Sequence, residues 1–185
     1  MKGFTLIETM VAITILTFAV SGPLFTASRA IVAAQTARDQ LTALYLAQEG
    51  IEYVRMMRDN EYLTAYHTPN NTDVSGTAWA HFLSSITKCD AKTDPTQACT
   101  FDSINGLSFT SCSTGSTGLR CTPLYMTGGM YRQRSEGGQE PFIFTRSIQA
   151  VAISVNEEKI ISTVSWSFHG TPYSVTVSDH LTSWK

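Results

Sequence analysis

Few residues in this 185-residue sequence have the type and spacing that chemistry requires, and Glu8 stands out among them. This carboxylate lies at the start of a long uncharged stretch, the twenty residues from Thr9 to Ser28. Burying an unpaired charge in lipid costs about 2.5 to 3.5 kcal/mol on insertion scales. A simple membrane anchor gains nothing from such a carboxylate, so Glu8 points to a second function for this segment.

Four cysteines form the other candidate set: Cys89, Cys99, Cys112 and Cys121. No two of them have the two-residue gap of a zinc knuckle, and His81 is too isolated to complete a ligand set, so we expect no metal site. An exported chain meets an oxidising compartment, which favours disulfides. Three connectivities are open. We favour the local pairs Cys89–Cys99 and Cys112–Cys121, because each closes a short loop worth about 2 to 3 kcal/mol.

Motifs for catalysis or cofactor binding are missing from the sequence. It contains no Gly-x-Ser-x-Gly elbow, no phosphate-binding glycine loop and no His-Glu-x-x-His helix, and its four histidines are scattered. With 13 basic and 15 acidic residues, the formal net charge of −2 argues against a broadly basic nucleic-acid-binding protein. The sequence therefore predicts a protein that is not an enzyme and has no cofactor.

The uncharged stretch is long enough to cross a membrane. At about 1.5 Å per residue, a helix from Thr9 to Ser28 rises roughly 30 Å, the thickness of the hydrocarbon core. The basic region before it is only Met1-Lys2-Gly3 and no Ala-x-Ala site follows, so a cleaved secretory signal fits poorly. Gly22 and Pro23 lie inside the stretch. Because proline removes a backbone hydrogen bond, we expect a kink or a local opening of the helix there.

The first residues carry a family resemblance. Lys2-Gly3-Phe4-Thr5-Leu6-Ile7-Glu8, followed by the apolar stretch, resembles the processing motif of type IV prepilins and type II secretion pseudopilins. The resemblance implies cleavage between Gly3 and Phe4 by a prepilin peptidase, and methylation of the new amine of Phe4. It also implies that Glu8 is the counter-ion for the N-terminal amine of a neighbouring subunit. The alternative for Glu8 is that its carboxylate reaches the lipid head groups.

The resemblance, which implies the leader, divides the chain into five segments together with composition and periodicity. A leader, residues 1–3, precedes a hydrophobic helix over 4–28 for the membrane or the filament core. An amphipathic continuation over 29–60 has apolar side chains three and four residues apart, and its stretch Leu46 to Glu52 resembles the same helix of minor pilins of the PilV and GspI type. Polar Asp59-Asn60-Glu61 is expected to end the helix. Residues 61–140 are predicted to be loop-rich and to hold the disulfides, with a short helix near Ala78 to Ile86.

The fifth segment, residues 141–185, alternates apolar and polar side chains and predicts an antiparallel meander of three strands. Val164, Trp166 and Phe168 share one face, as do Tyr173, Val175 and Val177, and Trp184 is expected at the edge of the core. These faces should pack on the soluble half of the long helix. The predicted fold class is α+β, of the type IV pilin kind.

The resemblance implies a minor pilin or pseudopilin, a structural subunit of a type IV pilus or a type II secretion pseudopilus. It implies insertion in the cytoplasmic membrane with an extracytoplasmic headgroup, then assembly into a filament at the cell surface or in the periplasm. The implied partners are other pilin or pseudopilin subunits, the prepilin peptidase, an inner-membrane platform protein and an assembly ATPase.

The alternative is a membrane-tethered module whose headgroup binds DNA, a glycan or a host surface and whose anchor never polymerises. One loop combines basic, aromatic and methionine side chains, namely Arg120, Met126, Met130, Tyr131, Arg132 and Arg134. Arginine and tyrosine can contact phosphate and stack on bases. Glu136 and Glu140 follow closely and argue against contact with DNA.

Overall fold

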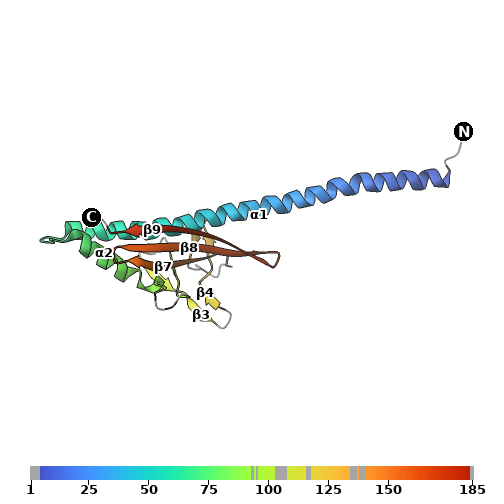
Figure 1. The fold of residues 1–185 in the computed structure, drawn as a ribbon. Coiled ribbons are helices and arrows are strands. Elements are labelled where there is room, and N and C mark those ends of the chain that lie inside the picture. The colour runs from blue at the N-terminus through green and yellow to red at the C-terminus, as the bar shows by residue number, and fades with distance from the viewer. Residues whose placement is uncertain are drawn as a thin grey trace. The chain divides into compact units, whose positions relative to one another are not determined.

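The computed structural model describes residues 5–92, 94, 96–102, 108–115, 118–133, 137 and 141–183 (Figure 1). The chain forms two compact units, Met1–Leu41 and Thr42–Lys185. The helical elements are α1 (Leu6–His67), α2 (Val74–Ser85) and a 3-10 turn, η1 (Thr87–Cys89). The strands are β1 (Cys99–Phe101), β2 (Phe109–Ser111), β3 (Ser113–Gly115), β4 (Gly118–Arg120), β5 (Tyr125–Thr127), β6 (Met130–Arg132), β7 (Thr145–Ser154), β8 (Glu157–Phe168) and β9 (Thr171–Thr182).

The first unit contains the apolar part of α1, a helix long and apolar enough to cross a membrane, with a mean hydropathy of 1.8. Each side-chain hydroxyl from Thr9 to Ser28 donates to a backbone carbonyl three or four residues earlier, at 2.8 to 3.2 Å. The six donors are Thr9, Thr14, Thr17, Ser21, Thr26 and Ser28. Since these hydroxyls need no water, the stretch suits an apolar surrounding.

Helix α1 is continuous through Gly22 and Pro23. Proline deprives the carbonyl of Ala19 of its usual donor, yet the helical hydrogen-bond pattern resumes on both sides. The predicted local opening is therefore not found in this structure. The predicted kink stays a prediction.

The end of α1 corrects the sequence-based boundary. The helix does not stop at Asp59-Asn60-Glu61 but continues to His67. Ala65 extends the buried face of the helix by two further turns, with only 3% of its surface exposed. The carbonyl of Ala65 accepts the backbone N–H of Thr68 at 3.3 Å and the side-chain amide of Asn71 at 3.1 Å, which together close the last turn.

Helix α2 begins four residues before the predicted start at Ala78. Asp73 is its N-cap, and the carboxylate accepts a hydrogen bond from the backbone N–H of Gly76 at 2.9 Å. A Cβ at position 76 would lie 2.2 Å from a carboxylate oxygen of Asp73, so glycine permits this cap. Helix α2 buries Trp79 and Phe82 against the core.

The main sheet is antiparallel, with the strand order β2-β1-β7-β8-β9. The predicted meander is confirmed as β7, β8 and β9, which lie side by side along α1 (Figure 1). His169 and Gly170 join β8 to β9, and both have positive φ angles, 49° and 79°, as a tight two-residue hairpin turn requires. Two further strands, β1 and β2, extend the predicted three-stranded sheet at the β7 edge.

The region 61–140 has more regular structure than its polar composition suggested. Besides α2 it contributes β1 and β2 to the main sheet and forms two separate hairpins, β3-β4 and β5-β6. Each of these strands has three residues. Strands that short have almost no periodicity of their own, and their partners decide their conformation.

Two clusters of buried side chains fix the sheet on the second half of α1. One joins Ala43, Leu46 and Ala47 of the helix to Val164 and Trp166 of β8. Tyr173, Val175 and Val177 of β9 pack against it, together with Phe168 at the end of β8. The other cluster joins the helix further along to α2, η1, β1 and β7. The predicted packing of the strand faces on the helix is therefore confirmed, whereas Trp184 lies outside the described residues.

Candidate functional site

Glu8 lies in the first turn of α1, and its backbone N–H bonds to the carbonyl of Thr5 at 3.1 Å. The side chain is exposed, and among the residues that the structure describes no cation pairs with it. A carboxylate at this end of a helix is favourable because the helix dipole is positive there. The processing residues Gly3 and Phe4 lie outside the described residues, so their roles stay predictions.

The next charged side chain after Glu8 is Arg29, whose guanidinium lies 5.1 Å from the ring centroid of Phe25. The 21 residue steps from Glu8 to Arg29 correspond to a rise of about 32 Å along the helix axis. That rise matches the roughly 30 Å hydrocarbon core of a bilayer. Glu8 and Arg29 therefore lie at the two ends of a helix segment whose length matches the hydrocarbon core of a bilayer.

Gly50 lies where α1 and the sheet approach each other closely. A Cβ at this position would lie 2.4 Å from the hydroxyl of Ser162 and 2.8 Å from Cδ1 of Ile148. Both distances are far below van der Waals contact. Glycine, which is unfavourable inside a helix by about 1 kcal/mol, is explained here by this close approach.

Arg146 ties the same helix to the sheet with a buried charge. Its side chain is only 1% exposed, and it is the second residue of β7. One guanidinium nitrogen donates to Glu49 of α1 at 2.7 Å and contacts the carbonyl of Leu46 at 3.3 Å. The guanidinium lies 3.9 Å from the ring centroid of Phe101. Burial lowers the pKa of Arg146, and the Glu49 carboxylate acts in the opposite direction.

A second, more exposed ion pair lies on the helix surface. Arg55 donates to Asp179 of β9 and to Glu52, both at 2.6 Å. The hydrogen bond from Arg55 holds the pKa of the Asp179 carboxyl below its usual value. Because these side chains are a third or more exposed, the pair contributes at most about 1 kcal/mol.

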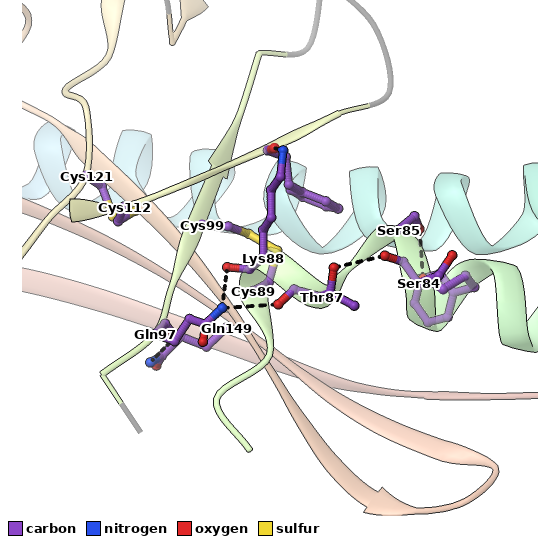
Figure 2. Close-up of a disulfide and its surroundings, with 12 residues drawn as sticks. Ser84, Ser85, Thr87, Lys88, Cys89, Gln97, Cys99, Cys112, Cys121 and Gln149 are labelled. Carbon is purple, nitrogen blue, oxygen red and sulfur yellow. Dashed lines mark hydrogen bonds between the residues drawn. A yellow bond between two sulfur atoms is a disulfide. The ribbon is translucent and has the colours of Figure 1, made fainter. Parts of the chain in front are cut away.

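The two disulfides join Cys89 to Cys99 and Cys112 to Cys121, which are the local pairs favoured by the sequence. Cys89 and Cys99 are buried in the core, 1% and 0% exposed. Figure 2 shows this bridge between η1 and β1, with Gln97 donating to the carbonyls of Thr87 and Lys88 at 3.1 and 3.3 Å. The bridge therefore fastens η1 to β1, the strand between β2 and β7 in the main sheet.

The loop considered for DNA contact does not form one surface in the described residues. Tyr131 packs against Phe142 and Phe144, with ring centroids 5.5 and 6.3 Å away, so its ring belongs to the core cluster rather than to a stacking platform. Met126 and Met130 are 42% and 53% exposed. Arg134, Glu136 and Glu140 lie outside the described residues, as does the side chain of Arg120.

The histidines and acidic residues assemble no metal site within the part of the chain that the structure describes, where no group of three potential ligands occurs. His180 pairs with Glu157 at 2.7 Å, and His81 approaches Glu61 at 3.6 Å. Both are surface pairs between a histidine and one carboxylate. That the protein has no active site stays a prediction.

Sequence reasoning missed the roles of Gly50 and Arg146. The signal for Arg146 was present, since one arginine interrupts the apolar positions of a strand that otherwise alternates, Phe142-Ile143-Phe144-Thr145-Arg146-Ser147-Ile148. A buried arginine in that pattern requires an acid on the facing element. Glu49 meets this requirement, but no spacing rule connects residues 97 positions apart.

The fold and the terminal segment together define a class of protein: an α+β chain whose long N-terminal helix is apolar at first and then packs on an antiparallel sheet. Residues 1–22 match the prokaryotic N-terminal methylation motif, the signature of type IV prepilins. No curated protein and no solved structure gives a match. The motif supports a type IV pilin-like protein that is processed as a prepilin, and a helix long and apolar enough to cross a membrane fits a membrane-anchored pilin. The motif implies, in general terms, a prepilin peptidase and other pilin subunits as partners.

Proposed function

We propose that this protein is a minor pilin or pseudopilin, a structural and non-enzymatic subunit that is built into a type IV pilus or a type II secretion pseudopilus. The single observation that carries the proposal is Glu8, a carboxylate at the start of an exposed apolar helix without a cationic partner among the described residues. A neighbouring subunit can supply the missing cation as the amine of its own Phe4 after cleavage. The two unfavourable charges then neutralise each other in the filament.

The six internally bonded hydroxyls support this assignment. A helix whose polar side chains are satisfied by its own backbone exchanges lipid for the apolar side chains of other helices without losing hydrogen bonds. Residues 6–28 therefore suit both surroundings that a pilin meets, first the cytoplasmic membrane and then the filament core. The headgroup would face the extracytoplasmic side, where the disulfides are stable.

In assembly, the platform protein and the assembly ATPase would act on the subunit from the membrane. The headgroup keeps its own core and disulfides throughout, because its two clusters involve residues from Ala43 onward. The pairing of Glu8 with a neighbour's amine would then set the axial position of each incoming subunit. These roles follow from the proposed function and from the charge arrangement of α1.

The test is coexpression of the full chain with a prepilin peptidase, followed by mass spectrometry of the mature N-terminus. We expect a chain that starts at Phe4 and carries one methyl group on its amine. Gly3→Val, which places a branched side chain at the cleaved bond, should leave the precursor uncut, whereas Gly22→Ala in the same segment should be processed normally. An intact Met1, or a cut near Ser28, would contradict the proposal and favour a tethered binding module or a secreted chain.

A further inference from the structure

A half-open cavity of about 340 Å³ lies at the surface of the headgroup, and no residue of α1 lines it. It lies between the end of α2, the turn η1 and the β7-β8 hairpin. Its walls are Leu83, Ser84, Ile86, Thr87, Asp90, Lys92, Ala152, Ser154, Val155 and Glu158. Volumes of this size are typical of sites for small organic ligands.

Glu158 is the unexpected member of this lining. It occupies an inward position of β8, two residues before the core residue Ile160, and only 7% of its surface is exposed. Its Oε2 atom is buried and has no hydrogen-bond partner. A carboxylate buried in this way requires a donor, and none of the described residues supplies one to Oε2.

A second carboxylate, Asp90, reinforces the negative charge of the cavity. Its backbone pairs with Ala150 of β7, and its Oδ1 accepts the backbone N–H of Lys92 at 2.8 Å. Burial and the charge of Asp90 raise the pKa of Glu158, while the more exposed Lys92 has a smaller opposite effect. The ionised form of Glu158 therefore lacks a sufficient nearby positive charge.

Two of the hydroxyls of the lining are free to accept hydrogen bonds. Ser84 donates its proton to the carbonyl of His81 at 2.7 Å. Thr87 donates to the carbonyl of Ser84 at 3.0 Å (Figure 2). Their remaining capacity is as acceptors, whereas the hydroxyl of Ser154 accepts from the backbone N–H of Asn156 at 3.3 Å and can still donate. With two carboxylates against the single ammonium of Lys92, acceptors prevail in the lining, and a complementary ligand is a donor with positive charge.

The apolar side chains of the lining indicate which kind of cation fits the cavity. Leu83, Ile86, Ala152 and Val155 offer contact to methylene groups rather than to a bare ion. A calcium ion takes six to eight oxygen ligands at about 2.3 to 2.6 Å, and this cavity is wide and has only two carboxylates. We propose that the cavity binds a primary ammonium or guanidinium group on a short aliphatic stem, with Glu158 as its principal counter-ion and Asp90 as its second.

Two sources could supply such a group: a free small amine, or a lysine or arginine side chain of another polypeptide. The first probe is n-butylammonium, titrated by calorimetry into the full-length chain in detergent micelles at pH 7. The second is Nα-acetyl-lysine-N-methylamide, which carries the same amine on a blocked backbone. Binding of both probes assigns the site to a side chain that can enter from a protein, and binding of butylammonium alone assigns it to a free amine.

Three variants locate the site. Glu158→Gln should weaken n-butylammonium binding by about tenfold or more, and Asp90→Asn by about threefold, because the first removes the buried ion pair and the second only a nearby charge. Glu157→Gln is the matched control, since this neighbour pairs with His180 and does not line the cavity. It should change the affinity less than about twofold. Ala152→Leu, which fills the cavity beside its cross-strand partner Glu158, should abolish binding.

The methyl resonance of Ile86 gives an independent readout, because this side chain lines the cavity and should shift on saturation with n-butylammonium. It also shows whether each variant retains the folded core. The proposal is overturned if n-butylammonium does not bind saturably, if Glu158→Gln binds it as well as the unaltered chain does, or if calcium alone binds at these residues. Because no step of this test involves cleavage or filament formation, its outcome is independent of the proposed function.

Discussion

Arg146 places a charge inside the headgroup core, where its only strongly bound partner among the described contacts is Glu49 on the facing helix. The two side chains differ in exposure, 1% for Arg146 and 40% for Glu49. Water can therefore solvate Glu49 if the arginine is removed, but it cannot reach Arg146 if the glutamate is removed. The pair should be asymmetric, so the two single substitutions should have unequal costs.

We expect Glu49→Ala to lower the free energy of unfolding by about 1 to 3 kcal/mol, because it leaves the guanidinium buried with too few acceptors. Arg146→Met, which keeps much of the buried volume, should cost less than about 1.5 kcal/mol. Glu52→Ala is the matched control on the same helix, since its pair with Arg55 is exposed. Denaturation of the headgroup, followed by the fluorescence of buried Trp79 and Trp166, measures all three. Equal costs for Glu49→Ala and Glu52→Ala would contradict this account.

Gly50 gives a second prediction at the scale of single residues. Gly50→Ala should destabilise the headgroup by about 1 to 3 kcal/mol, although alanine is the better helix former, because its Cβ would overlap Ser162 and Ile148. Gly22→Ala provides the comparison, since no atom lies within 4 Å of a Cβ at that position. It should leave headgroup stability unchanged in the same fluorescence assay. A stabilised Gly50→Ala variant would show that α1 and the sheet separate more easily than the structure indicates.

Glu158 should make headgroup stability depend on pH. Its pKa is raised in the folded chain, so the folded state holds the proton more tightly than the unfolded state. The free energy of unfolding therefore falls as pH rises through the folded pKa, and at pH 7 the ionised group is unfavourable. Without ligand, Glu158→Gln should raise the melting temperature at pH 7, by about 2 to 4 °C for each kcal/mol gained. The gain should shrink as the pH is lowered through the folded pKa, and a gain that is the same at every pH would refute this assignment.

At the scale of elements, the two disulfides should contribute differently. Cys89–Cys99 lies in the core and connects η1 to β1, whereas both cysteines of the Cys112–Cys121 pair are partly exposed. Replacing Cys89 and Cys99 by serine should cost about 2 to 5 kcal/mol, since it removes a cross-link and places two hydroxyls in an apolar cluster. The same change at Cys112 and Cys121 should cost less. Thermal unfolding under oxidising conditions checks the order, which would be wrong if the second variant melted lower.

The elements also show how far a sequence predicts this fold. The long helix and the β7-β9 meander were predictable, because each repeats its own period over ten or more residues. The end of α1 was not, since polar Asp59-Asn60-Glu61 looks like a helix end and only tertiary burial of Ala65 extends it. Strands β1 and β2 are too short to show a period. The start of α2 could have been predicted from Asp73, whose side chain caps the helix. The apolar pattern pointed instead to the later start at Ala78.

The candidate sites also differ in whether the sequence alone predicts them. Gly3, Phe4 and Glu8 form a contiguous motif, so the sequence alone identifies them. Arg146 with Glu49, and Glu158 with Asp90, are pairs from distant segments that only the folded sheet brings together. The sequence predicts these elements separately but not the side chains that meet between them.

At the scale of the whole molecule, charge is strongly segregated along the chain. The first 34 residues hold only three charged side chains, Lys2, Glu8 and Arg29, and the remaining 25 of the 28 are distributed over the other 151 residues. The leader that contains Lys2 would be lost on cleavage. Glu8 is then the only charged side chain between Phe4 and Ser28, so any effect of changing it should appear in assembly rather than in headgroup folding.

Glu8→Gln tests this separation between assembly and folding. The glutamine keeps the shape of the side chain but removes the counter-ion for a neighbour's N-terminal amine, which would then be buried alone at a cost of about 3 to 5 kcal/mol. Pili or pseudopili sheared from cells should therefore lose this subunit by tenfold or more, while headgroup melting and membrane insertion stay unchanged. Glu52→Gln, an exposed glutamate further along the same helix, should be incorporated normally.

If Glu8→Gln is incorporated as well as the unaltered chain, Glu8 lies at the lipid head groups and the pairing is wrong. If incorporation is lost but returns when the neighbouring subunit's amine is also neutralised by acetylation, the loss arises from the unpaired charge rather than from a misfolded helix.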